Sequence, residues 1–159
     1  MSLLFDALHD LAELALGCTH CRTQPTDALG DRAALAKPKM GGLVYLSSPR
    51  AAIHVGVLAA RRDCSLLAAR LLGQRSREHL PSSLVRGAMC ELAYLLAGGV
   101  KRRLTVAETL SVGQPTFFDG DVRPQRDAQT QLIHVELDGI RATLVSVARS
   151  DSAHLLASH

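Results

Sequence analysis

Cysteine is the most reactive residue type in this chain, and two of its four cysteines have a spacing that can do chemistry. Cys18 and Cys21 form a CxxC motif that encloses His20. A zinc site usually needs a second ligand pair at similar spacing, and the sequence has none. The motif also lacks the strand-then-helix setting of a thioredoxin-type redox site. We therefore expect two reduced thiols where a helix ends, with metal binding or redox chemistry as the alternative, and we expect small core residues at Cys64 and Cys90.

A single carboxylate, Glu91, stands in the middle of the long and mostly apolar segment 82–104. Apolar residues recur in this segment at helical spacing, namely Leu84, Ala88, Leu92 and Leu95, widened by Leu96 and Val100. The pattern predicts a helix over about 83–103, with Ser82 or Ser83 as its N-cap. Basic residues lie at the C-terminal end of this helix, where positive charges interact favourably with the helix dipole. Glu91 is then either a solvated outer-face residue or a functional group.

Shorter elements must position these residues. The predicted strands are 42–46, 52–59, 106–118, 130–137 and 140–148, and the other predicted helices are 2–16 and 63–72, the second with Asp63 as its cap. Asp138 and Gly139 predict a tight hairpin between the last two strands. Segment 18–40 reads as a long connection that holds one short strand, and 150–159 as a weakly ordered tail. Strands in two runs, with helices in runs, indicate an α+β fold: an antiparallel-rich sheet with a long helix and shorter helices packed on it.

The composition excludes several classes of protein. A chain of 159 residues with 47% hydrophobic and 21% charged residues predicts one globular domain. The net charge of +3 is small and the arginines are scattered, so we expect no nucleic-acid partner. No apolar run approaches the roughly 20 residues of a membrane span, and the start carries acidic residues rather than the basic ones of a signal peptide. We expect a cytoplasmic protein with no membrane partner.

The order of these elements resembles the CheX-like branch of the CheC/CheX/FliY family of chemotaxis phosphatases. Four segments carry the resemblance: the paired strands LVYL and AAIHVGVLA, the short helix LLAARLLG, the long helix with ELAYLLAGGVKRRL, and SVGQPTFFDG. The resemblance covers about 42–149 and includes the first helix. It implies a single CheX-like domain over residues 1–159.

The resemblance also implies a site on the long helix. Family members act on phosphorylated CheY-type response regulators, and their helix carries a Glu and, three positions on, an Asn. The Asn orients the water that attacks the aspartyl phosphate, and the Glu pairs with a lysine of the regulator. The corresponding residues here are Glu91 and Tyr94, and a position that is often polar in the family is Gly87. A phenol has one hydroxyl and is larger than a carboxamide, so we do not expect it to place that water.

Two functions follow from this comparison. The first is a non-catalytic adaptor or regulator in chemotaxis or two-component signalling, which binds a receiver domain through Glu91, Tyr94 and Gly87. The alternative is an active phosphatase that uses a shifted residue, with Gln74, Gln114 and Tyr94 as candidates. We expect no cofactor and no metal site, since a magnesium ion would belong to the receiver partner. The resemblance further implies a homodimer, formed by extending a sheet.

Overall fold

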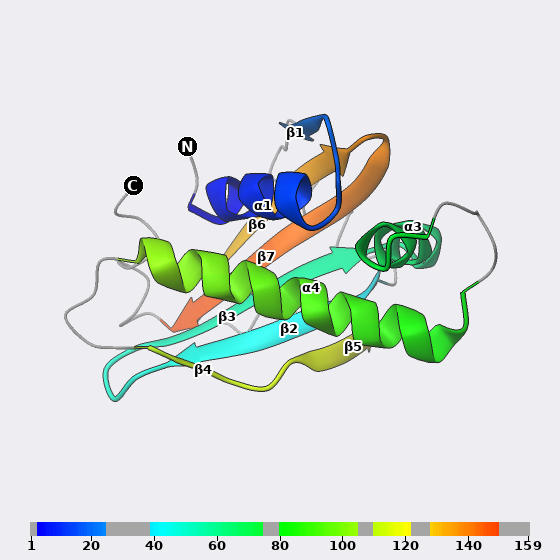
Figure 1. Ribbon diagram of the computed structural model, residues 1–159. Helices are drawn as coiled ribbons and strands as arrows, with labels where there is room; N and C mark the ends of the chain where they lie inside the picture. The colour runs from blue at the N-terminus through cyan, green and yellow to red at the C-terminus, as the bar shows by residue number, and fades with distance from the viewer. Residues whose placement is uncertain (1–2, 25–38, 75–79, 105–109, 122–127, 150–159) are drawn as a thin grey trace.

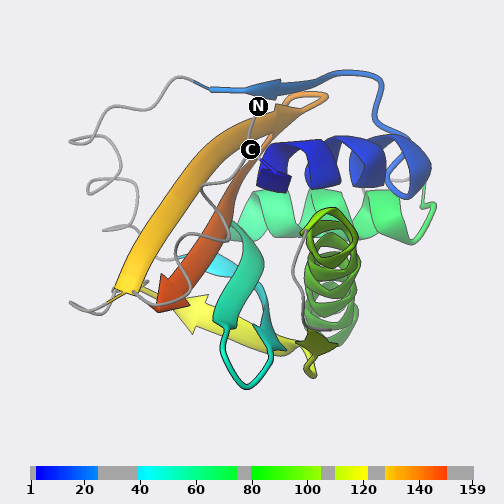
Figure 2. The same ribbon diagram turned by 90° about the vertical axis from the view of Figure 1, so that its left-hand side faces the viewer.

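Three helices lie on one face of a seven-stranded sheet in the computed structural model, which describes residues 3–24, 39–74, 80–104, 110–121 and 128–149 (Figure 1). The strand order is β1-β6-β7-β3-β2-β4, and β5 also pairs with β2. Every pairing between these strands is antiparallel. Figure 2 shows the helices and the sheet as two layers. The predicted α+β fold with an antiparallel sheet is confirmed.

The described elements follow the predicted order. The helices are α1 (Leu3–Leu14), α3 (Arg61–Leu71) and α4 (Ser82–Arg103). The strands are β1 (Cys21–Thr23), β2 (Lys39–Ser47), β3 (Ala52–Ala59), β4 (Ser111–Val112), β5 (Thr116–Gly120), β6 (Ala128–Leu137) and β7 (Ile140–Arg149). Most bounds differ from the predicted ones by a few residues, because helix and strand ends are the weakest part of any pattern. The short strand expected within 18–40 is β1.

One predicted strand is in fact two. The expected strand over 106–118 is divided into β4 and β5 by a segment that contains Gly113 and Pro115. Proline has no backbone N–H for a ladder, so it interrupts the strand. Gly113 donates a backbone hydrogen bond to the Tyr45 carbonyl at 2.7 Å, which keeps the segment at the edge of β2. The part of the prediction within 105–109, and the tail 150–159, lie outside the described residues.

The predicted helix caps are wrong. The N-caps are Ala60 for α3 and Pro81 for α4, and neither helix has a side-chain cap hydrogen bond. Both helices begin earlier than the sequence pattern suggested, so Ser82 and Asp63 lie inside the first turn instead of before it. From that position, the negative charge of Asp63 still interacts favourably with the positive N-terminal end of the α3 dipole.

The buried face of α4 includes most of the predicted apolar stripe but not Leu84 or Leu95. The buried residues are Val85, Ala88, Met89, Leu92, Ala93, Leu96, Ala97, Gly99 and Val100. Of the predicted stripe, Ala88, Leu92, Leu96 and Val100 are buried, whereas Leu84 is 45% exposed and Leu95 is half-buried. Leu84 and Val85 are both apolar, so the helical period alone does not show which of these two neighbours faces the sheet. The structure buries Val85.

The hairpin between β6 and β7 is confirmed. Asp138 and Gly139 have φ values of 49° and 84°, and the register places Leu137 opposite Ile140. Two successive positive φ values are the signature of a type I′ turn, which Asp-Gly favours. Helix α1 packs on α4 through Ala7 and Gly99, where an added Cβ at Gly99 would lie 3.2 Å from the Ala7 Cβ.

Helix α4 also has the length and apolar composition of a membrane span. Core helices of globular proteins meet the same criterion, and half of the most apolar part of α4 is buried in this fold. Its buried face contacts the sheet through β2 and β3 (Figure 1).

Candidate functional site

Gly42 of β2 sets how closely α4 approaches the sheet. A Cβ atom added at Gly42 would lie 2.9 Å from the Ala93 Cβ and still closer to the Met89 carbonyl oxygen. Both separations are shorter than van der Waals contact, so a glycine is needed where the strand and the helix meet. Met89 and Ala93 therefore mark the side of α4 that faces the sheet.

The opposite side of α4 is exposed. Residues three or four positions apart share a helix face, and on this face they are Leu84, Gly87, Glu91 and Tyr94. We call this surface the α4 face. Leu84 and Tyr94 are each 45% exposed, and Gly87 and Glu91 are exposed as well. The α4 face thus combines the carboxylate of Glu91 and the phenol of Tyr94 with the apolar side chain of Leu84 and the bare backbone of Gly87.

All three residues predicted for the site lie together on the α4 face. Glu91 and Tyr94 are both exposed, and Tyr94 is 45% exposed rather than part of the core. A Cβ added at Gly87 would have no heavy atom within 4 Å, so the helix surface is open beside Glu91. The functional roles of the three residues stay predictions.

Strand β5 borders the α4 face. The guanidinium carbon of Arg86 lies 4.8 Å from the centre of the Phe117 ring, a cation–π contact. Cys90 is half-buried, and burial raises the pKa of its thiol while Arg86 lowers it. The expectation of a small core residue at Cys90 therefore holds only in part, whereas Cys64 is fully buried.

The two glutamines proposed for a shifted catalytic residue lie outside α4. Gln74 follows the end of α3, and Gln114 lies between β4 and β5. Both side chains are exposed. Helix α4 itself contains neither Asn nor Gln, so the α4 face has no carboxamide beside Glu91.

A second group of polar residues gathers at the β6–β7 turn. The carboxylate of Asp138 accepts hydrogen bonds from the backbone N–H of Thr19 at 3.1 Å and of His20 at 2.8 Å. It also accepts one from the Thr19 hydroxyl at 3.2 Å and pairs with Arg70 at 3.1 Å. Desolvation alone would raise the pKa of the Asp138 carboxyl, but these hydrogen bonds and Arg70 together lower it.

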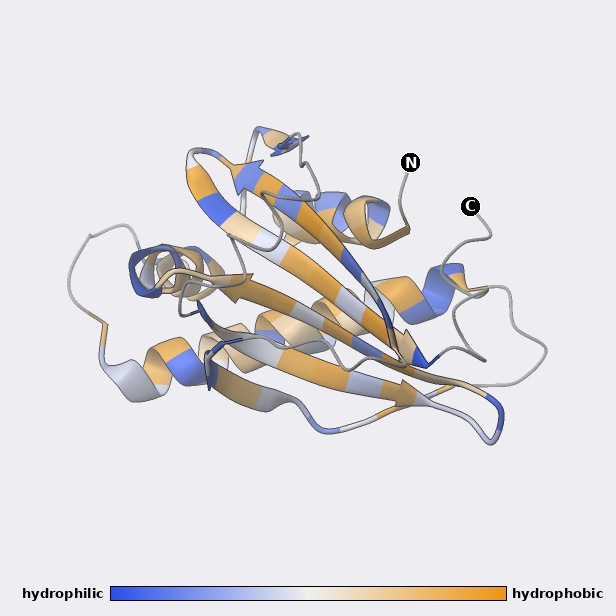
Figure 3. Ribbon diagram, turned by 180° about the vertical axis from the view of Figure 1, so that it is seen from behind, coloured by the Kyte–Doolittle hydropathy of each residue, from blue (hydrophilic) through white to orange (hydrophobic). Residues whose placement is uncertain are grey.

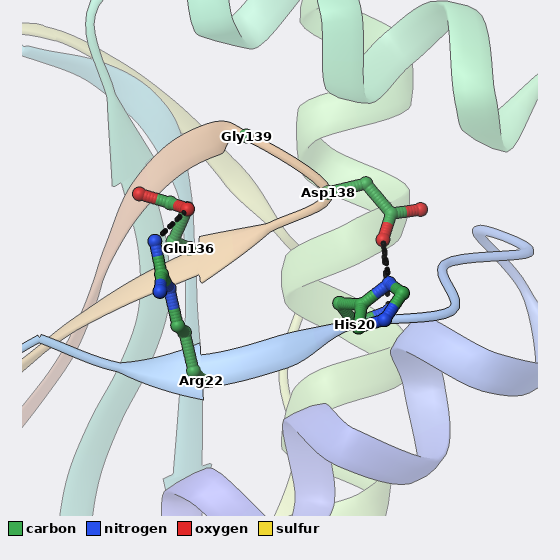
Figure 4. A pocket seen from close by; sticks show the side chains of 5 residues that line it. All are labelled: His20, Arg22, Glu136, Asp138 and Gly139. Carbon is green, nitrogen blue, oxygen red and sulfur yellow. Dashed lines mark hydrogen bonds and ion pairs between the residues drawn. The ribbon is translucent and has the colours of Figure 1, made fainter.

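An open pocket of about 380 Å³ lies beside this turn, lined by His20, Arg22, Glu136, Asp138 and Gly139 (Figure 4). Arg22 pairs with Glu136 at 2.6 Å, and the Nδ1 atom of the His20 ring lies 3.6 Å from the Asp138 carboxylate. The sequence indicated only a turn at Asp138, because a local Asp-Gly signal says nothing about a partner 118 positions away. Within the described ranges, no three His, Cys, Asp or Glu side chains are grouped so that they could hold a metal ion.

Comparison with known proteins rests on structure. No family model matches this chain, and no curated protein matches it by sequence. Chemotaxis protein CheX from Vibrio vulnificus has a TM-score of 0.70 at 13% identity, over 92% of this chain and 93% of that chain. CheX in the CheX–CheY–BeF3–Mg complex from Borrelia burgdorferi has a TM-score of 0.69 at 13% identity, over 93% and 96%. A CheC-like superfamily protein from Shewanella sp. PV-4 has a TM-score of 0.67 at 14% identity, over 92% and 95%. The chain therefore has the fold of the CheC/CheX/FliY chemotaxis proteins, as the resemblance predicted.

Proposed function

We propose that this chain is a non-catalytic CheX-like domain that acts as an adaptor or regulator in chemotaxis or two-component signalling by binding a receiver domain. The shared fold supports this proposal, and the similar CheX from Borrelia burgdorferi is seen in a complex with CheY. The observation that carries the non-catalytic part is Tyr94, which lies one helical turn from Glu91 on the α4 face. The resemblance expects a carboxamide at that position.

The chemistry of the two side chains explains this choice. Hydrolysis of a phosphoryl group depends on positioning the attacking water. A carboxamide offers a carbonyl acceptor and an NH₂ donor at one short reach, whereas a phenol offers a single hydroxyl at the end of a ring. The α4 face can therefore bind a partner through Glu91 and through the apolar surface of Leu84 and Tyr94 without orienting a water. In this proposal the chain has no cofactor of its own, and any Mg²⁺ is held by the receiver.

Binding tests the first part of the proposal. We expect Glu91→Lys to weaken binding of the cognate receiver domain about tenfold or more, a loss of about 1.4 kcal/mol, because it replaces a charge that would pair with a receiver cation. Isothermal titration against the receiver domains of the host measures this. Glu13→Lys is the matched control, since Glu13 is an exposed glutamate on α1. Unchanged affinity for Glu91→Lys, or an equal loss in both variants, would contradict the proposed surface.

Phosphate release tests the second part. We expect the unmodified chain to leave the lifetime of a phosphorylated receiver unchanged, and Tyr94→Asn to restore hydrolysis by recreating an acid–amide pair. A lifetime shortened about tenfold by the unmodified chain corresponds to about 1.4 kcal/mol off the barrier. If Glu91→Ala abolishes that effect, the phosphatase alternative is correct. Gln74→Ala and Gln114→Ala would then identify the residue that replaces the family's amide.

A further inference from the structure

Cys18 and Cys21 have no part in the function proposed above, yet the fold brings both to its core side. Cys18 is 8% exposed and belongs to the hydrophobic core, and Cys21 is half-buried and packs against the same core. In the β1–β6 register, Cys21 lies opposite the buried Leu137. Side chains of opposite residues in antiparallel strands share a face, so Cys21 is on the helix-covered face of the sheet.

Hydrogen bonds to Asp138 and to the end of α1 hold the segment between the two cysteines. The backbone N–H groups of Thr19 and His20 donate to the two carboxylate oxygens of Asp138, and the His20 carbonyl accepts from the Asp138 N–H at 3.0 Å. The Cys18 N–H donates to the Ala12 carbonyl at 2.9 Å. These hydrogen bonds make the segment between the two thiols part of the folded structure.

The two thiols also interact electrostatically. Burial raises the pKa of both, and a charge on Cys18 raises the pKa of Cys21 further. The guanidinium of Arg70 lowers the pKa of Cys18, and the Asp138 carboxylate raises the pKa of both thiols, so both pKa values stay above the ordinary value. The geometric basis for pairing the two thiols is that Cys18 and Cys21, three residues apart, pack against the same core.

We propose that Cys18 and Cys21 form a reversible intramolecular disulfide when a peroxide oxidises them. The more exposed Cys21 attacks one peroxide oxygen as a thiolate, so that an S–O bond forms, the O–O bond breaks, and the departing hydroxide becomes water. The Cys18 thiolate then attacks the sulfenic sulfur, forming the S–S bond and releasing a second water after proton uptake. Two thiols and one hydrogen peroxide give one disulfide and two waters, and a dithiol reductant reverses the step.

A metal site is the competing use of a CxxC motif. Zinc needs four ligands, and the described residues provide no group of three or more His, Cys, Asp or Glu around this pair. The nearby Asp138 carboxylate is occupied by Thr19, His20 and Arg70. His20, between the cysteines, has a side chain that is 88% exposed. The pair therefore fits a two-electron sulfur couple better than a metal centre.

Peptide mapping of the full chain tests the proposal. Arg22 is the first Lys or Arg of the sequence, so trypsin releases both cysteines in the single peptide 1–22, separate from those with Cys64 and Cys90. After hydrogen peroxide and iodoacetamide, we expect this peptide to have lost the mass of two hydrogens and to carry no alkyl group. Dithiothreitol should restore two alkylatable thiols. The rate should rise about tenfold per pH unit near neutral pH, because both thiols are mostly protonated there.

Variants separate this disulfide from other oxidation. Cys18→Ser and Cys21→Ser should each abolish the mass loss in peptide 1–22, whereas Cys90→Ser should leave it unchanged. The proposal is overturned if peptide 1–22 of the unmodified chain keeps two alkylatable thiols while Cys90 is oxidised. It is also overturned if peroxide yields only sulfinic acid or disulfides between chains. Because the decisive readout uses the unmodified chain, a serine variant that failed to fold would not affect it.

Discussion

Asp138 joins the β6–β7 turn to the segment after α1. Its carboxylate accepts three hydrogen bonds, from Thr19 and His20, and forms an ion pair with Arg70. All three partners are far away in the sequence. The residue has a φ of 49°, which Asn tolerates as Asp does. Asn is therefore the substitution that removes the charge and keeps the turn.

We expect Asp138→Asn to lower the free energy of unfolding by about 1 kcal/mol. The substitution replaces the two charged carboxylate oxygens by one neutral amide oxygen, and it leaves Arg70 without an ion-pair partner at this position. Urea denaturation at neutral pH measures the change. An unchanged free energy of unfolding would show that the hydrogen bonds and the ion pair of Asp138 make no net contribution to stability.

The same carboxylate predicts a pH dependence. Its pKa is lowered in the fold, so its stabilisation is present above the pKa of the unfolded chain, about 3.9, and is lost as the pH falls through the folded value. The stability difference between the unmodified chain and Asp138→Asn should therefore be constant from about pH 5 to 7 and shrink below about pH 4. Denaturation curves over this range check it. A difference that grew on acidification would contradict the assigned sign.

At the scale of elements, the contact between α4 and β2 decides which side of the helix faces outward. Gly42→Ala places a methyl group against the Met89 carbonyl and the Ala93 side chain. We expect a loss of about 1–3 kcal/mol, because backbone atoms cannot move aside as a side-chain end can. Chemical denaturation compares this variant with the unmodified chain.

Gly87→Ala is the matched control for Gly42→Ala. It is the same substitution on an exposed turn of α4, where an added Cβ meets no heavy atom within 4 Å. Alanine is the better helix former, so stability should rise by up to about 1 kcal/mol. If both variants lost stability alike, the close packing at Gly42 would not be the cause.

At the scale of the whole molecule, no described helix covers the sheet face opposite α1, α3 and α4 (Figure 3). Tyr45 is 39% exposed on this face, and its ring centre lies 4.7 Å from that of His54. The register continues the row from His54 to the half-buried Val147. The homodimer that the resemblance implies, formed by extending a sheet, stays a prediction, and we expect Tyr45 to contribute to its interface because exposed aromatic residues are favoured there.

Light scattering at micromolar concentration should give about twice the chain mass of 17.0 kDa. Tyr45→Lys should shift the mass toward the monomer, whereas Tyr94→Lys, which changes an equally exposed tyrosine on the α4 face, should not. A mass near 17.0 kDa for the unmodified chain rules out a stable dimer at that concentration.

Local patterns in the sequence determined the order of the elements and the α+β class. The alternation that ends at Leu137 and resumes at Ile140, with Asp138 and Gly139 between, predicts a hairpin from neighbouring residues alone. The long apolar period around Leu92 likewise predicts α4. These features depend on a few consecutive residues, so one sequence is enough to find them.

Only the tertiary structure decided what those elements present to solvent. The periodicity of α4 predicted that Leu84 faces the core, whereas the structure buries Val85 and brings Met89 against Gly42 of β2. The resemblance named Glu91 and Tyr94, but that choice of side is what leaves them together on an open surface. Asp138 depends on the same kind of long-range contact, because its partners become neighbours only when β1 pairs with β6. Contacts between distant segments leave no local period in the sequence, so no pattern within a segment can predict them.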